Sequence, residues 1–248
     1  MKDSNEIYKA NETQTSYGEV IGILLLDCCV PFIPGDVANA TTYNFPVRFE
    51  KVEGYTTDRA IGKDPTIFDS LLTAALNLEK NGVRAITGDC GFMALHQEKL
   101  KQHLRIPVFL SSLLQIHFIR QIISNKKSIG IICGDSRSLN DSLLKSINIQ
   151  NSDDLVIYGL EDKKFFADAV LNEVGTLNAP RVEQEVVQTA KELVSKNKNI
   201  GAILLECSCL PPYGYAVQKA VNLPIFDYFT MINYVYNAVV KHEFEGLM

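Results

Sequence analysis

Apolar runs of strand length alternate with amphipathic stretches along almost the whole chain. The apolar runs predict strands at 20–26, 83–88, 107–110, 128–133, 154–160, 201–205 and 224–226, and alternation of apolar and polar residues predicts one more at 45–52. The amphipathic stretches predict helices at 64–82, 91–104, 111–124, 138–147, 161–174, 180–196 and 211–221, with a last one from 228. Strands that are apolar throughout and alternate with helices are typical of parallel sheets covered on both faces. The pattern therefore predicts an α/β protein.

The chain carries two copies of one plan. Cys90 and Cys207 each follow an apolar strand and an acidic residue, and they lie 117 positions apart (207 − 90). Pro107 and Pro224, which each open a short strand, have the same offset (224 − 107). A period of this length indicates a duplicated half and is too long for a solenoid repeat. We therefore expect two similar halves, each with one cysteine at the end of a strand.

Composition and charge narrow the function classes. The 248 residues are 46% hydrophobic and 21% charged, which is ordinary for a globular protein. A net charge of −5 argues against a nucleic-acid-binding surface, and the apolar runs are too short to span a bilayer. The first eighteen residues are polar and lack the apolar core of a secretion signal, so we expect a flexible leader and a cytoplasmic protein. The six cysteines are then expected to be reduced thiols.

The two cysteines occupy positions at which a thiol can do chemistry. Each is predicted at an abrupt turn between a strand and a helix, where free backbone N–H groups and the positive end of the helix dipole converge. Such a position favours the thiolate, so we expect one of the two cysteines to have a lowered pKa. Ligands of parallel sheets gather outside the carboxyl ends of the strands. We therefore expect both thiols to face one active-site cleft between the halves.

Three motifs together resemble the aspartate/glutamate/hydantoin racemase superfamily, over nearly the whole chain from about residue 19. They are Thr87-Gly-Asp-Cys-Gly-Phe92, Glu206-Cys-Ser-Cys-Leu-Pro-Pro-Tyr213 and the loop Pro34-Gly-Asp-Val-Ala-Asn-Ala-Thr-Thr42. The resemblance implies two Rossmann-like lobes with parallel four-stranded sheets, related by pseudo-two-fold symmetry.

The two lobes are expected to share the chain unevenly. We place lobe one at 19–111 plus 227–248 and lobe two at 112–226, behind the leader at 1–18. The helix after Asp227 is expected to return and pack on lobe one.

The resemblance also implies an activity. Members of the superfamily racemise or epimerise a carbon next to a carboxylate without a cofactor, and they use one thiolate as base and one thiol as acid. By resemblance these two roles fall on Cys90 and Cys207. We expect an isomerase with no cofactor and no metal, a small carboxylate-bearing substrate of amino-acid or hydantoin type, and neither a nucleic-acid nor a membrane partner. A homo-oligomer is left open.

Substrate-binding groups are expected at the two cysteine turns and in nearby loops. Backbone N–H groups at the turns can hold a carboxylate and the charge that develops on it, and loop side chains can add contacts. The expected residues are Gly91, Phe92, Ser208 and Cys209 at the turns, and Asn39, Thr42, Ser111 and Ser112 in loops.

Other activities on the same scaffold stay open. Amino-acid racemases of the superfamily typically show Cys-Asn-Thr at the first site, whereas Gly91-Phe92 follows Cys90 here and Ser208-Cys209 follows Cys207. The alternatives are a decarboxylase or a cis–trans isomerase of a small diacid, and a non-catalytic protein that binds a small acid.

The remaining chemistry-bearing residues have structural interpretations. Strand alternation should point Asp89 and Glu206 away from the catalytic face, so we expect them to form structural charge pairs. The cysteines outside the catalytic pair are expected to pack in the interior, although Cys209 can also line the site. A zinc site made of Cys207 and Cys209 with Cys28 and Cys29 fits no usual spacing. Packing or surface positions are expected for Cys28, Cys29, Cys133, His96, His103, His117 and Arg48.

Overall fold

The structure is a computed structural model that describes residues 7–248. Residues 1–6 of the predicted leader lie outside the described residues. Residues 7–18 contain no helix or strand and are mostly exposed, although Thr13 reaches the carbonyl of Lys80 through its hydroxyl (3.3 Å).

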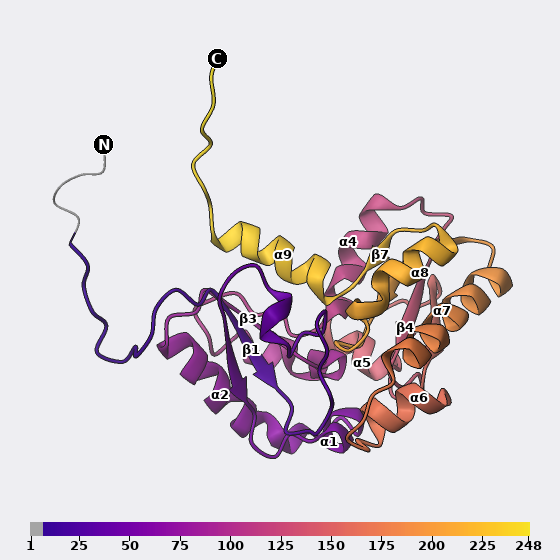
Figure 1. Cartoon of the computed structure of the whole chain (residues 1–248), viewed down its shortest axis with the longest axis horizontal. Helices are drawn as coiled ribbons and strands as arrows, with labels where there is room; N and C mark the ends of the chain where they lie inside the picture. The colour runs from indigo at the N-terminus through magenta and orange to yellow at the C-terminus, as the bar shows by residue number, and fades with distance from the viewer. Residues whose placement is uncertain (1–6) are drawn as a thin grey trace.

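Within residues 7–248, seven strands form two separate parallel sheets (Figure 1). The first sheet has the order β2-β1-β3, and the second has the order β5-β4-β6-β7. The predicted α/β class with parallel sheets is confirmed. The strands are β1 (Ile21–Leu25), β2 (Val47–Lys51), β3 (Ala85–Gly88), β4 (Ser128–Cys133), β5 (Leu155–Gly159), β6 (Ile200–Leu205) and β7 (Ile225–Phe226).

The first sheet has three strands where four were predicted. The segment expected as its fourth strand contributes only an isolated parallel bridge between Val108 and Ile86. The side chain of Gln97 binds this segment from the other side, donating to the Val108 carbonyl (2.8 Å) and accepting from the Leu110 amide (2.9 Å). The pairing with β3 uses the backbone groups of Pro107 and Phe109, and Gln97 satisfies the opposite edge of the segment.

Most predicted helices are present with shorter bounds. They are α2 (Phe68–Lys80), α3 (Gln97–Leu100), α4 (Gln115–Ile122), α5 (Asp141–Ser146), α6 (Lys164–Phe166), α7 (Ala179–Lys196), α8 (Gly214–Val221) and α9 (Tyr228–Val239). The helix predicted at 91–104 begins with six residues of 3₁₀ helix, and the one at 161–174 continues from α6 into a π turn at 167–171. A short helix, α1 (Thr57–Ile61), was not predicted.

Each sheet is covered on both faces. On the first sheet, α2 packs on the face that carries Leu24 and Ile86, while α9 packs on the face that carries Ile21 and Ile23. The C-terminal helix thus returns from the second half to complete the first (Figure 1). On the second sheet, α7 and α8 cover one face, and α4 and α5 cover the other. The exact lobe boundaries stay a prediction.

None of the helices in the described residues has the length and apolar character that crossing a bilayer demands.

Candidate active site

The carboxyl ends of β3 and β6 meet at a pocket between the two sheets. Cys90 lies two residues after the end of β3, and Cys207 lies two residues after the end of β6. Both line a cavity of about 50 Å³. The space is that of a few water molecules, so only a compact ligand fits this conformation. The lining residues are Leu26, Cys28, Val30, Phe32, Thr57, Ile61, Asp89, Cys90, Gly91, Phe92, Gly134, Val170, Leu171, Glu206, Cys207, Ser208 and Cys209.

Hydrogen bonds tie the two cysteine turns directly together. The Ser208 hydroxyl donates to the carbonyl of Asp89 across the boundary between the halves. The Ser112 hydroxyl donates to the carbonyls of Leu205 (3.2 Å) and Glu206 (2.9 Å). Because the side chain of Ser208 is used in this way, its backbone N–H is the group left for a ligand. Within residues 7–248, the amides of Ser208 and Cys209 donate to no protein acceptor.

Asp89 and Glu206 line the pocket, and the prediction that they point away into charge pairs is wrong. Strand alternation does not reach them, because β3 ends at Gly88 and β6 ends at Leu205. Neither residue takes part in an ion pair within the described residues. Instead, the Leu26 amide donates to both oxygens of Asp89 (3.0 and 3.2 Å), and the Gly134 amide donates to Oε2 of Glu206 (3.3 Å). The other oxygen of Glu206, Oε1, is buried without a hydrogen-bond partner.

Burial of these carboxyl groups keeps them close to protonation at neutral pH. Burial raises the pKa of the Asp89 carboxyl to about 8, partly offset by the Leu26 amide. Burial likewise raises the pKa of Glu206 to about 7, against a smaller opposite effect of the Gly134 amide. The pocket therefore holds two carboxyl groups that change charge near physiological pH.

The pKa of the Cys90 thiol is raised, whereas a position at a helix N-terminus was expected to lower it. Burial, followed by the nearby Glu206 and Asp89, raises the pKa of the Cys90 thiol well above its ordinary value, and the Phe92 amide lowers it only slightly. The turn after Cys90 is a buried 3₁₀ segment rather than an α-helix, so little dipole faces the sulfur. Among the described residues that line the pocket, none is Lys, Arg or His. The expected stabilisation of a thiolate does not apply to Cys90.

The expected turn residues line the pocket, and the expected loop residues do not. Gly91, Phe92, Ser208 and Cys209 are in the lining. The four loop residues are held instead by internal hydrogen bonds, because position in a loop says nothing about where a side chain points. Asn39 caps the turn at 40–42, Thr42 donates to the Asp36 carbonyl, Ser111 accepts from the Leu113 amide, and Ser112 joins the second half as described above.

Several pocket residues escaped the sequence interpretation. Cys28 and Leu26 follow β1, and the same strand-end rule that selected the two cysteines could have found them. Thr57, on the unpredicted α1, presents a hydroxyl that donates to no acceptor within the described residues, and no sequence signal marked it. Val170 and Leu171 come from the π turn, which periodicity does not reveal.

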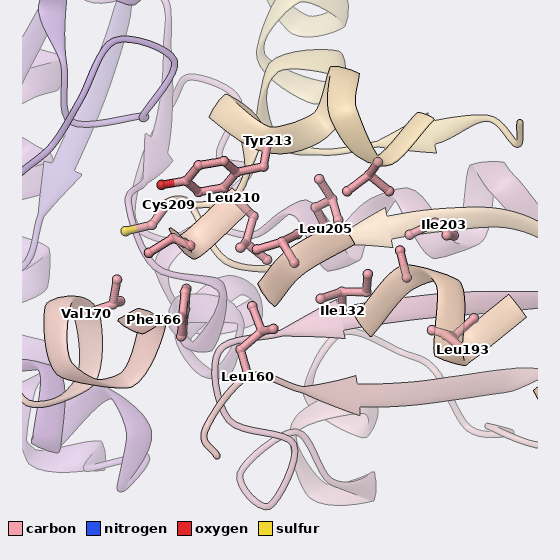
Figure 2. Close-up of a cluster of buried hydrophobic side chains, with 14 of the residues drawn as sticks. Ile132, Leu160, Phe166, Val170, Leu193, Ile203, Leu205, Cys209, Leu210 and Tyr213 are labelled. Atoms are coloured by element: carbon pink, nitrogen blue, oxygen red, sulfur yellow. The ribbon is translucent and has the colours of Figure 1, made fainter. Parts of the chain in front are cut away.

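Cys209 lies in the apolar interior of the second half and also lines the pocket. It packs against the apolar cluster of the second half, and Figure 2 shows its sulfur directed away from Leu205 and Leu210, on the same side as the Tyr213 hydroxyl. The Cys207 thiol, burial and the Asp36 carboxyl raise the pKa of Cys209 well above its ordinary value. The Asp36 carboxyl is itself buried, which raises its pKa to about 7.

The remaining candidates lie elsewhere, as interior or surface residues. Cys133 is buried in β4, and His96 is buried beside Tyr55 and Phe68, where burial lowers its pKa to about 4. Arg48 donates to Ser16 and pairs with Glu19, outside the pocket. Within residues 7–248, no three His, Cys, Asp or Glu side chains are grouped so as to hold a metal ion.

Comparison with known proteins gives similar sequences of one kind. No family model matches the chain. Dimethylsulfoniopropionate lyase 5 of Emiliania huxleyi (strain CCMP1516) is 28% identical over 92% of this chain and 47% of its own length. Dimethylsulfoniopropionate lyase of Durusdinium sp. clade D is 29% identical over 92% and 77%, and lyase 3 of the same E. huxleyi strain is 32% identical over 86% and 58%. The chain thus spans only about half to three quarters of these relatives.

Solved structures share the fold at much lower identity. Arylmalonate decarboxylase has a TM-score of 0.59 and 14% identity, covering 91% of this chain and 94% of that one. Glutamate racemase RacE1 from Bacillus anthracis has a TM-score of 0.57 and 14% identity (90% and 85% covered), and allantoin racemase from Pseudomonas fluorescens has 0.57 and 12% (92% and 100%). The predicted racemase-type fold is confirmed at the level of architecture.

Proposed function

We propose that this chain is an enzyme that removes the proton next to a carboxylate and expels a leaving group from the adjacent carbon. It would be a lyase built on the racemase scaffold, and its cysteines would supply the acid–base chemistry. The observation that carries the proposal is the pocket itself, to which each half contributes one cysteine at the end of a parallel strand. The similar sequences named as lyases favour elimination over the isomerisation that the resemblance implied.

The reaction balances without a cofactor. Dimethylsulfoniopropionate, the compound in the relatives' names, carries a carboxylate and, two carbons away, a dimethylsulfonium group. A cysteine thiolate takes the proton from the carbon next to the carboxylate, and the C–H electron pair becomes the new carbon–carbon double bond. The carbon–sulfur bond breaks, and dimethyl sulfide leaves with its electron pair, so acrylate remains. No oxidant or reductant is consumed.

The surroundings of the two thiols assign them different parts. Cys90 is held as a thiol, because burial and two carboxyl groups raise its pKa. We therefore assign the base to Cys207 and a proton-donating role, toward the substrate carboxylate, to Cys90. The free amides of Ser208 and Cys209 and the hydroxyl of Thr57 would hold that carboxylate as negative charge grows on it.

A second candidate is racemisation or epimerisation at the same carbon. The observation in its favour is that two thiols, not one, line the pocket, whereas an elimination needs only one base. A small-acid decarboxylase uses the same carbanion chemistry. A cytoplasmic location and a homo-oligomeric state stay predictions.

The deciding experiment separates these reactions by their products. The purified chain is incubated in D₂O with dimethylsulfoniopropionate, with chiral α-substituted acids and hydantoins, and with arylmalonates. Dimethyl sulfide in the headspace together with acrylate in the NMR spectrum supports the lyase. Deuterium exchange with racemisation of a chiral acid, or release of CO₂ from a malonate, without any elimination would overturn it.

A further inference from the structure

We propose that Glu206 is the anchor for the positive end of the substrate and that it restricts the pocket to small zwitterions with a sulfonium or quaternary ammonium group. This inference rests on the proposed function, because it takes the pocket at the cysteines to be the substrate site. It assigns recognition of the cation to one named carboxylate.

The first observation is that one oxygen of Glu206 has no partner. The residue is only 1% exposed, and its Oε1 atom receives no hydrogen bond. Its Oε2 atom receives one bond, from the Gly134 amide at 3.3 Å. A buried carboxylate is costly unless it is paired, and no cation within the described residues pairs with this one. The missing partner is therefore supplied by what enters the pocket.

The second observation is that the first half makes room for this carboxylate. An added Cβ at Gly91 would lie 1.7 Å from Oε1 of Glu206. Only glycine at this position leaves room for the carboxylate. The carboxylate thus reaches from the second half across to the turn that carries Cys90. A group bound to Oε1 lies at the junction of the two halves, close to the reacting thiols.

The third observation is the chemistry of the remaining walls. Phe32 and Phe92 line the same pocket, together with aliphatic side chains, and none of the described lining residues is cationic. Apolar and aromatic walls with one anion suit a cation that carries methyl groups, which has no N–H to donate and attracts aromatic faces. The other pocket carboxylate, Asp89, already accepts from the Leu26 amide. Glu206 is therefore the carboxylate that is free to bind.

The test measures binding rather than turnover. The probes are 3-(trimethylammonio)propionate, which has the cation, and 4-methylpentanoate, which replaces the sulfonium end by an uncharged isopropyl group. Calorimetry should show that the unaltered chain binds the ammonio compound at least tenfold more tightly. Glu206→Gln should weaken this compound by about 30-fold or more, as expected when one partner of a buried charge pair is removed. It should leave 4-methylpentanoate within about threefold.

A matched control and a second variant keep the result interpretable. Glu161→Gln removes a carboxylate from the same half, outside the pocket, and should change neither affinity. Glu206→Asp keeps the charge but withdraws it from Gly91, and it should give an intermediate loss, which guards against a folding defect in the glutamine variant. Equal affinity of the unaltered chain for both probes would overturn the proposal. So would a Glu206→Gln variant that binds the ammonio compound normally and loses only kcat, since that would make Glu206 a proton-transfer group. Because neither probe needs to react, a failure of the lyase assay leaves this result readable.

Discussion

The two cysteine turns occupy equivalent positions in the duplicated halves, but their neighbours do different work. Asp89 precedes Cys90 and accepts from the amide of Leu26, within its own half. Glu206 precedes Cys207, is one methylene longer, and reaches over Gly91 into the other half. Both acids accept an amide of their own half, and Glu206 also extends its second oxygen across the boundary.

The residues after the cysteines differ in a complementary way. Ser208 sends its hydroxyl across to the carbonyl of Asp89, whereas the equivalent Gly91 has no side chain and admits Glu206. Duplication therefore provides two like thiols, and divergence around them gives a pocket with two unlike ends. A racemase gains from two matched faces, while an elimination from a zwitterion has a carboxylate end and a leaving-group end. The asymmetry of the neighbours favours the second.

Replacement of Cys90 or Cys207 by serine should show most clearly, through the loss of kcat, how far the two cysteine turns differ. Serine is close in size to cysteine but a very poor base at neutral pH, so loss of a proton-transfer group costs roughly 10²–10⁴-fold in kcat. We expect Cys207→Ser to show this loss in dimethyl sulfide release, and Cys90→Ser to show a smaller one, of about tenfold. Circular dichroism serves as the control for folding. Equal losses in both variants, with opposite stereochemical preference in deuterium exchange, would restore the symmetric two-base mechanism.

Gly91→Ala tests the space that the first half leaves for the second. The new Cβ would lie 1.7 Å from Oε1 of Glu206 and force the carboxylate out of place. Overpacking of this kind costs about 1–3 kcal/mol in the free energy of unfolding, and we expect KM for a sulfonium substrate to rise about tenfold or more, by analogy with a displaced charge partner. Chemical denaturation and steady-state kinetics measure the two effects.

The matched control is Gly134→Ala in the other half. There an added Cβ meets nothing nearer than 3.8 Å, which is ordinary contact, so its free energy of unfolding should change by less than about 1 kcal/mol. If Gly91→Ala were as mild as this control, the carboxylate would not be fixed at the boundary between the halves.

Sequence patterns predicted the architecture and the two cysteine turns for clear physical reasons. Buried parallel strands must be apolar throughout, so β1, β4 and β6 are visible as runs. The start of the helix predicted at 64–82 was nearly right, because Asp64 and Pro65 open a 3₁₀ turn at 65–67 that leads into α2. The packing of the last helix on the first sheet could be proposed because this helix follows the final strand of the second half and has no place in that half of the repeated plan.

The orientation of short polar side chains could not be predicted in the same way. Asp89 and Glu206 lie one residue beyond their strands, where alternation of faces ceases to apply, so their place in the pocket was missed. Thr57 comes from a five-residue helix that is too short for periodicity to reveal. Ser111 and Ser112 were predicted as substrate-binding residues, but their hydroxyls form hydrogen bonds with the backbone of Leu113 and Glu206 instead.

The pH dependence of stability should distinguish the two acids from ordinary surface carboxylates. Their pKa values in the folded chain, about 8 for Asp89 and about 7 for Glu206, lie above the ordinary values of 3.8 and 4.5. A raised folded pKa gives stability that is complete below the unfolded pKa and is lost as pH rises through the folded value. The unliganded chain should therefore lose stability between about pH 5 and pH 8, by up to about 1.4 kcal/mol per pH unit for each proton released.

Glu206→Gln should reduce the slope of this profile by about half up to about pH 7, because Asp89 still titrates, while Glu161→Gln should keep the original slope. Urea denaturation at four pH values measures both. Of the other titratable groups near Glu206, Cys90, Cys133 and Tyr228 have pKa values raised above their ordinary values and stay protonated up to pH 8 in all three proteins. Asp135, whose pKa is lowered, stays ionised over the same range. Stability that rises from pH 5 to pH 8, or an unchanged slope in the glutamine variant, would show that the carboxylate is ionised and compensated in the free chain.

Cys209→Ala should have the smallest effect on activity, and it tests the last pair of equivalent positions around the two cysteines. Cys209 is equivalent to Phe92, since they are 117 residues apart (209 − 92), and both are buried beside the pocket. Loss of one sulfur from the cluster around Leu210 and Tyr213 should lower the free energy of unfolding by about 1 kcal/mol, whereas Phe92→Ala should cost about 3 kcal/mol or more. We expect kcat of Cys209→Ala to fall less than about threefold, because Cys207 keeps its place as base. A fall of about 10²-fold with stability intact would instead make the Cys209 thiol, in contact with Cys207 and Asp36, part of the path by which the abstracted proton leaves the pocket.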